Sequence, residues 1–191
     1  MRTSILPLLL LSVACSKKPQ TALIHGHVYL QTRVGEIRRG AAAPVGLLST
    51  ASSYRQAWRA LCDSQDVAFR AKTRADSILV DREKDPSRAI RLLEAQQISI
   101  IEGARHDRDV RYASLLDLSE APGRTDIDGA FRFESVPPGR YWLFSGMELM
   151  DHPYGWFVPI AVVAGESLTV DLSTANVLPA IFNCDDDLPA R

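Results

Sequence analysis

Alternating apolar and polar positions predict β-strands near both ends of the chain. Ile24, Gly26, Val28 and Leu30 fall on one face of a first strand, and residues 41–50 form a second, more continuously apolar strand. The later alternations run through residues 130–134, 141–145, 156–162 and 168–172. Short strands separated by turn residues, with no helix among the later ones, are typical of an antiparallel β-sandwich.

The stretch between these two groups of strands has a helical pattern. From 52 to 118 it contains one proline, one glycine and 23 charged residues, 12 positive and 11 negative. Its apolar residues recur at the spacing of one helix face. They are Ala57, Leu61, Ala68, Ala71, Ala75 and Ile78, then Ile90, Leu93, Ile100 and Ala104. Asp85 and Pro86 separate the two sets, because aspartate caps a helix and proline suits its first turn.

These patterns predict an α+β fold in which a helical hairpin interrupts a sandwich of about seven strands. We expect two antiparallel helices of about 30 residues, each about 45 Å long, that approach closely along the alanine-rich stripe. The sandwich is expected over 21–51 and 123–178, the hairpin over 52–122 and a tail over 179–191. Large side chains gather at the hairpin base and are expected to dock on the sandwich, namely Tyr54, Trp58, Tyr112 and Leu115.

The first residues of the chain predict an export signal. Arg2 precedes an uncharged run over residues 5–14, which is too short to span a membrane. The sequence around Ala14 and Cys15 resembles the lipobox of bacterial lipoproteins, in which the cysteine is lipidated. The resemblance implies a lipoprotein signal peptide at 1–14 and a lipid anchor on Cys15, a tether over 15–20, Sec-type export and a location in the cell envelope. The alternative is an ordinary signal peptide with a free Cys15.

Composition narrows the function classes. The chain has 191 residues, 46% hydrophobic and 24% charged, with a net charge of −1. A nucleic-acid-binding protein normally carries a basic excess, so that class is disfavoured. Three cysteines are too few for a disulfide scaffold. Outside the cytosol Cys62 and Cys184 are candidates for one disulfide, and the sequence leaves open whether it forms.

A longer motif lies in the second group of strands. Its positions are Thr125, Asp126, Gly129, Phe131, Val136, Pro137, Gly139 and Tyr141. This motif resembles that of carboxypeptidase regulatory-like domains, which are transthyretin-like sandwiches found in many secreted bacterial proteins. The resemblance implies an Ig-like or transthyretin-like sandwich with an accessory role and no common activity. It places the hairpin between the second and third strands and assigns no role to the inserted residues.

Candidate chemistry is sparse. His152, Tyr154 and Trp156 are expected to lie in a loop, where aromatic rings could bind a carbohydrate. His25 and His27 share one strand face and, with His152, are the candidate metal ligands, although two histidines alone do not complete a zinc site. No catalytic motif is found, and no cofactor is indicated.

The sequence therefore favours a non-catalytic, lipid-anchored envelope protein. In this interpretation the sandwich is a structural or protein-binding module and the hairpin contacts a protein partner. The alternatives are a carbohydrate-binding accessory domain that uses the aromatic loop, and a metal-dependent enzyme that uses the three histidines.

Overall fold

The computed structural model describes residues 20–50, 54–149, 152–179 and 184. The predicted signal peptide, Cys15 and most of the tether lie outside these residues. The strands are β1 (Ala22–His27), β2 (Tyr29–Gln31), β3 (Ile37–Arg39), β4 (Pro44–Ser49), β5 (Ala121–Arg124), β6 (Ala130–Val136), β7 (Gly139–Leu149), β8 (His152–Val162), β9 (Ser167–Thr169) and β10 (Leu178–Pro179), and the helices are α1 (Tyr54–Arg82) and α2 (Pro86–Asp117). None of the helices in the described part of the chain is both long enough and apolar enough to cross a membrane.

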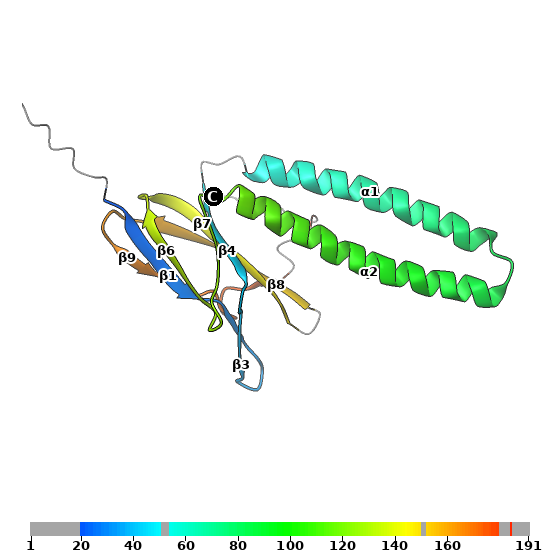
Figure 1. Cartoon of the computed structure of the whole chain (residues 1–191), viewed down its shortest axis with the longest axis horizontal. Coiled ribbons are helices and arrows are strands. Elements are labelled where there is room, and N and C mark those ends of the chain that lie inside the picture. Colours follow the sequence, from blue (N-terminus) through cyan, green and yellow to red (C-terminus); the bar gives the residue numbers. More distant parts are fainter. Residues whose placement is uncertain (1–19, 51–53, 150–151, 180–183, 185–191) are drawn as a thin grey trace, which may run out of the picture.

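Two sheets enclose the sandwich core, and both ends of the chain contribute to each. The five-stranded sheet has the order β10-β8-β7-β4-β5, and the three-stranded sheet has the order β6-β1-β9. A small β2–β3 ribbon extends from the body (Figure 1). Fully buried side chains such as Ile24, Val45, Leu143 and Trp156 fill the space between the sheets. The predicted assembly of one sandwich from distant chain segments is therefore correct.

The pairing is not antiparallel throughout. β1 pairs with β6 antiparallel but with β9 parallel, and Val28 forms a further parallel bridge with Leu172. Alternation along one strand sets which side chains face the core but carries no information about the direction of the neighbouring strand. The sequence pattern therefore could not detect this exception.

The hairpin is inserted between β4 and β5, which lie at the predicted second strand (41–50) and at the return of strands near 123. β4 and β5 are adjacent, with Leu47 paired to Ala121, so the chain leaves and re-enters the sheet at neighbouring positions. The sheet resumes at Ala121, two residues before the predicted boundary. Pro179, expected in the tail, belongs to β10 and pairs with Tyr154.

The motif residues build a turn and its supports. The Asp126 carboxylate accepts hydrogen bonds from the Asp128 and Ala130 amides at 2.9 and 2.8 Å, and Gly129 adopts a φ of 78°. The buried Thr125 hydroxyl accepts from the Ala43 amide at 2.8 Å and donates to the Gly40 carbonyl. Phe131 fills the core. At the next turn, between Pro137 and Gly139, the Tyr141 hydroxyl donates to the Pro137 carbonyl at 3.0 Å. These residues therefore stabilise the sandwich.

Candidate functional site

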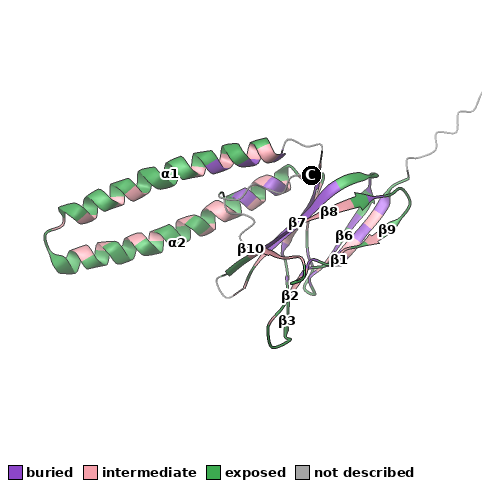
Figure 2. Ribbon diagram, turned by 180° about the vertical axis from the view of Figure 1, so that it is seen from behind, coloured by how far each residue is buried: buried purple, intermediate pink, exposed green. Residues whose placement is uncertain are grey.

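The base of the hairpin packs on the outer face of the five-stranded sheet. We call this contact the junction cluster, and its buried members are Leu48, Tyr54, Trp58, Cys62, Leu115, Trp142, Phe144 and Phe157. The Trp142 and Phe157 rings stack with centroids 5.0 Å apart, and the Tyr54 ring lies 5.9 Å from that of Phe157. The strand β7 is thus covered on both faces, by the sandwich core on one side and by the hairpin on the other. Figure 2 shows this buried region at the base of both helices.

A disulfide and a buried polar network also hold the two helices, further along them from the sheet. Cys62 of α1 is bonded to Cys184, with Cα atoms 5.4 Å apart. Beside this bond the Arg111 guanidinium donates to Gln65 Oε1 at 2.7 Å and lies 3.4 Å from Cys184 Sγ. Gln65 Nε2 donates to the Asp107 carbonyl at 3.1 Å. Burial lowers the pKa of Arg111, partly offset by the Asp107 carboxylate. Both helices and the chain at Cys184 are therefore tied together here.

Beyond this level, along residues 66–106, neither helix has a fully buried side chain. The Lys72 ammonium donates to Ser99 Oγ across the seam. Nearer the tip, a crevice of about 230 Å³ separates the helices between Val80 and Leu92. The predicted alanine-rich contact is wrong, because Ala68, Ala71 and Ala75 are exposed. Their spacing reflects a real helix face, but that face does not point at α2.

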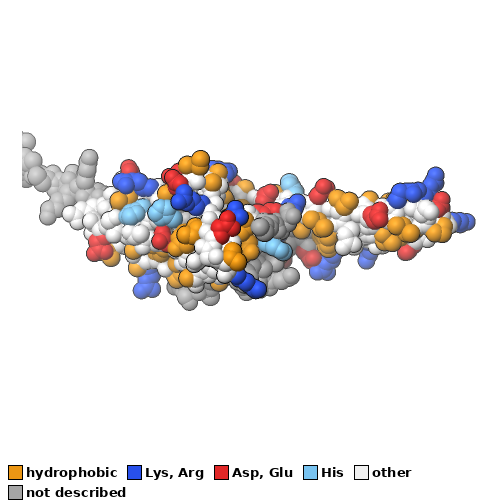
Figure 3. All heavy atoms as spheres, turned by 90° about the horizontal axis from the view of Figure 1, so that it is seen from below, with side chains coloured by type: hydrophobic (Ala, Val, Ile, Leu, Met, Phe, Trp, Pro, Cys, Tyr) orange, Lys and Arg blue, Asp and Glu red, His pale blue; other side chains and the backbone are white. Residues whose placement is uncertain are grey.

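Large aliphatic side chains remain exposed along this distal part. On α1 the most exposed are Val67 (67%), Leu79 (58%) and Ile78 (43%), and on α2 they are Ile98, Ile90, Ile101 and Leu93. Figure 3 shows hydrophobic side chains along the hairpin, interspersed with charged ones. Exposed apolar side chains that gather on one element are typical of interaction sites, so the distal hairpin is a candidate contact surface.

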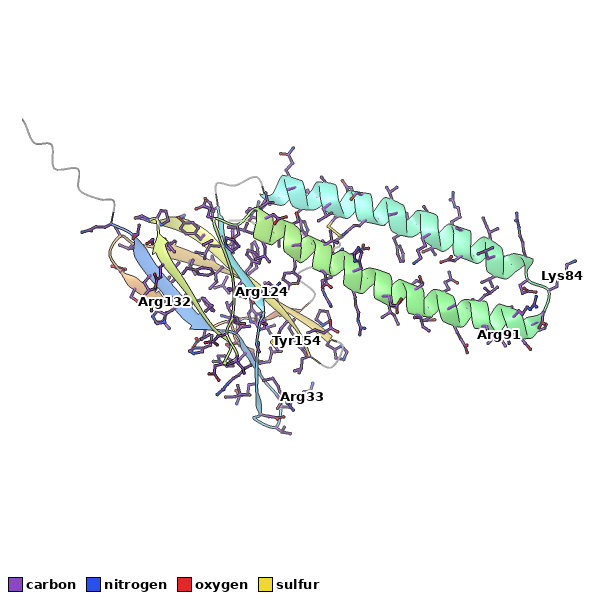
Figure 4. The ribbon with its side chains drawn as sticks, viewed as in Figure 1. Arg33, Lys84, Arg91, Arg124, Arg132 and Tyr154 are labelled. Carbon is purple, nitrogen blue, oxygen red and sulfur yellow. A yellow bond between two sulfur atoms is a disulfide. The ribbon has the colours of Figure 1, made fainter. Side chains whose placement is uncertain are left out.

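A groove of about 460 Å³ lies where α2 crosses the ends of β7 and β8, and we call it the junction groove. Tyr154 of β8 and Arg124 of β5, both labelled in Figure 4, line it together with Arg108 of α2 and Glu148 of β7. Arg108 Nη2 donates to Glu148 Oε2 at 2.6 Å, and Arg105 Nη2 lies 3.5 Å from the other carboxylate oxygen. The groove thus combines a tyrosine ring with charged hydrogen-bonding groups.

Tyr112 forms the inner wall of this groove. Its hydroxyl donates to the Ser145 carbonyl at 3.3 Å, so α2 is bonded to the sheet backbone. Burial raises the pKa of Tyr112 well above its usual value of 10; Arg108 opposes this shift and Asp109 adds to it. Tyr112 therefore stays protonated and serves as a donor at neutral pH.

The predicted aromatic loop is a strand. His152, Tyr154 and Trp156 belong to β8, which pairs with β7 along its whole length. Trp156 is fully buried in the sandwich core, and its indole nitrogen donates to the Ser173 carbonyl at 2.8 Å. His152 is exposed and Tyr154 is half-buried. Of the three residues, only Tyr154 lines the junction groove. The prediction of an aromatic binding loop is therefore wrong, and one of its residues remains as a candidate binding residue.

The three candidate metal ligands are not brought together. His25 and His27 lie on β1 of the three-stranded sheet, whereas His152 lies on β8 of the other sheet. The His25 ring contacts Thr169 Oγ1 at 3.2 Å, and the His27 ring contacts Asp171 Oδ1 at 3.3 Å. Across the described residues, no three histidine, cysteine, aspartate or glutamate side chains are grouped to hold a metal ion. The metal site built on these histidines is wrong.

Sequence reasoning missed the arginines at the junction. Arg105, Arg108 and Arg111 recur every third residue, which places them toward one side of α2. That spacing was a usable signal for polar contacts at the helix base. Their partners Glu148 and Gln65 come from β7 and α1, and nothing in the local sequence links them to α2.

No protein-family model matches the sequence, and no curated protein matches it either. Among solved structures, the chain is similar to a candidate carbohydrate-binding protein from Pseudomonas aeruginosa, at 18% identity and a TM-score of 0.39, over 84% of this chain and 92% of that chain. It is also similar to the pilus backbone protein RrgB from Streptococcus pneumoniae, at 11% identity and a TM-score of 0.25, over 78% of this chain and 40% of that one. These TM-scores are too low for either likeness to bear on function.

Proposed function

We propose that this chain is a non-catalytic, lipid-anchored protein of the cell envelope whose helical hairpin contacts another protein. The observation that carries this proposal is the contrast between the two halves of the hairpin. The base is held by the junction cluster, the disulfide and the Arg111 network. The distal part has no fully buried side chain and exposes large aliphatic ones. A hairpin whose base is fixed to the sandwich and whose distal part exposes apolar side chains is suited to binding a partner protein. We call this distal part, residues 66–106, the arm.

The sandwich is proposed to be of the carboxypeptidase regulatory-like, transthyretin-like type. The turn geometry at Asp126 and Gly129 and the Tyr141 hydrogen bond support this assignment, because the resemblance rests on these residues. The proposed role is accessory, in that the sandwich supports the arm.

The arm is tested by photo-crosslinking in envelope preparations. A photoreactive residue at Leu93, half-exposed on the distal arm, is expected to give a discrete adduct with another polypeptide. The matched control is the same group at Val163, which is similarly exposed but lies on the sandwich. Equal adducts at both positions, or none at Leu93, would count against a partner-binding arm.

The anchor is tested separately by fractionation. Lipidation of Cys15 predicts that Cys15→Ser moves the protein from the membrane fraction to the soluble fraction, because acyl chains supply the membrane affinity. An unchanged distribution would remove the anchor from the proposal without affecting the arm.

A second candidate function is binding of a polar ligand such as a carbohydrate in the junction groove. The specific observation is that Tyr154 lines a groove beside Arg108, Glu148 and Arg124. A ring with neighbouring hydrogen-bonding groups suits a sugar. Titration of a glycan panel against Tyr154→Ala and the wild type tests this function. It is supported if one glycan binds the wild type and loses affinity in the variant, and it is dismissed if no glycan binds.

A further inference from the structure

The exposed side of α1 is segregated by charge. Successive helix residues are 100° apart, so each residue between 57 and 79 can be assigned to a sector of the helix. The seven charged residues of this stretch, including Asp63, Lys72 and Arg74, occupy about two-thirds of the circumference. The remaining third, which we call the apolar face of α1, consists of Ala57, Ala60, Leu61, Ser64, Val67, Ala68, Ala71, Ala75, Ile78 and Leu79.

This apolar face is open to solvent and has no partner among the described residues. The hydrogen bonds that Gln65 and Lys72 make with α2 come from other sectors, and of the apolar face Leu79 also borders the crevice between the helices. Ala57 and Leu61 are partly covered at the base, and the other eight residues of the face are exposed, including the branched side chains of Val67, Ile78 and Leu79. Six helical turns of uncharged surface without a cover favour burial against another helix.

We propose that a second copy of this chain docks on this face, with the two α1 helices antiparallel and centred on Ala68. This inference rests on the proposed function, because it names the partner of the arm. Positions 57, 61, 64, 68, 71, 75 and 78 are separated alternately by four and three residues, which is the spacing of a coiled-coil seam. A two-fold axis at Ala68 maps this set of positions onto itself to within one residue, as a contact between identical surfaces requires.

Side-chain sizes favour the antiparallel arrangement. About a centre at Ala68, Leu61 of one copy faces Ala75 of the other, and Ala57 faces Ile78. Each large side chain therefore meets a small one, and the helix separation stays even. A parallel pair would place Leu61 on Leu61 and Ile78 on Ile78, with only Ser64 and alanines in the seam between them. Small residues along the centre permit an interaxial distance near the short end of the usual range.

Charges along one border of the face are also complementary in this arrangement. Asp63 and Arg74 lie on the same border of the apolar face, on either side of Ala68. Antiparallel pairing brings Asp63 of one copy within about one residue, or 1.5 Å along the axis, of the level of Arg74 in the other. Two symmetry-related pairs of opposite charge would form, and these pairs select the antiparallel orientation.

The first test is the oligomeric state of the full chain by sedimentation equilibrium. The wild type is expected to sediment as a dimer, with twice the mass of one chain. Ala68→Glu places two carboxylates face to face and is expected to raise the dimer dissociation constant by about 100-fold or more. The matched control is Ser77→Glu, which adds the same charge to an exposed residue on the charged side of α1 and should leave the constant unchanged. Circular dichroism confirms that both variants are folded.

The second test fixes the orientation. A mixture of Ala57→Cys and Ile78→Cys chains is expected to crosslink as a mixed pair, and Ala68→Cys chains as a self-pair. Self-crosslinking of Ala57→Cys would denote a parallel pair and overturn the antiparallel arrangement. A protein that stays monomeric at all concentrations would overturn the proposal that a second copy docks on this face. If the Leu93 photo-crosslink to a different polypeptide persists in that case, the partner-binding arm stands and only this inference fails; if it too is absent, both fail.

Discussion

At Gly146 the missing side chain sets how closely α2 approaches β7. A Cβ built on Gly146 would overlap the Tyr112 hydroxyl and ring, so Gly146→Ala must displace Tyr112 from the sheet. We expect a loss of about 1–3 kcal/mol in the free energy of unfolding, which is typical of overpacking. The measurement is urea denaturation followed by tryptophan fluorescence.

Gly103→Ala is the matched control for this substitution. Gly103 lies in α2 with nothing within 4 Å of its added Cβ, so alanine there should stabilise the protein by about 0.5–1 kcal/mol. The Gly146→Ala penalty should also shrink in a Tyr112→Ala background, since the overlapping ring is gone. An undiminished penalty in that background would show that the overlap with Tyr112 is not its cause.

Tyr112 makes the stability of the protein sensitive to high pH. Its pKa is raised well above 10 in the folded chain, chiefly by burial, so above pH 10 the unfolded chain releases a proton that the folded chain keeps. The free energy of unfolding should therefore be level below this pH and fall as the pH rises through 10. Tyr112→Phe should make the fall shallower in denaturant titrations across pH 9 to 11.

Tyr141 contributes to the same fall, because burial also raises its pKa. Tyr112→Phe is therefore expected to remove part of the pH dependence, and the double variant with Tyr141→Phe should remove more. A profile that is identical in the wild type and in Tyr112→Phe would contradict the buried position of this hydroxyl.

At the scale of one element, local patterns predicted the helices well but not what covers their faces. Asp85 accepts from the Ser87 amide at 2.8 Å and Pro86 begins α2, as the capping pattern predicted. The helices have 29 and 32 residues. Periodicity identifies residues that share a face, whereas the choice of partner depends on the whole fold. The alanine-rich stripe was therefore correctly found and wrongly assigned to the α1–α2 contact.

The misread strand β8 has a related explanation. Pro153 and Gly155 interrupt the local pattern and favour a loop. In the fold, β8 pairs on one side with β7 along its length, and on the other side with β10 only at Tyr154 and Gly155. A proline has no N–H to donate, and it is tolerated at an edge position of a sheet, where no neighbouring strand needs that hydrogen bond. The residues of β8 alone do not indicate where this strand lies in the sheet.

The disulfide joins α1 covalently to the chain at Cys184. Cys62 and Cys184 are 122 residues apart, and closing a loop of this size stabilises the folded state by roughly 4–5 kcal/mol in the chain-entropy model. Reduction, or the double variant Cys62→Ser with Cys184→Ser, is expected to lower the melting temperature by on the order of 10 °C. Calorimetry with and without reductant measures this, and the double variant should not respond to the reductant. An unchanged melting temperature in the reduced wild type would contradict the stabilising role.

For the molecule as a whole, the structure divides the hairpin into a base that belongs to the folded body and an arm that does not. Trp142, Phe144 and Phe157 on the outer face of the sheet are buried in one cluster with Tyr54, Trp58 and Leu115 of the base. Sequence analysis predicted the docked aromatic side chains at the base, since they gather at one end of both helices. The junction cluster confirms this docking.

The most direct measurement is the melting temperature of two shortened chains. In the first, a short Gly/Ser turn replaces residues 66–106, which keeps the junction cluster, the disulfide and the Gln65 contact with Asp107. In the second, the turn replaces all of α1 and α2. We predict that the first chain melts within a few degrees of the wild type, and that the second melts far lower or does not fold. Unfolding of the first chain, or a second chain as stable as the wild type, would contradict the division of the hairpin into base and arm.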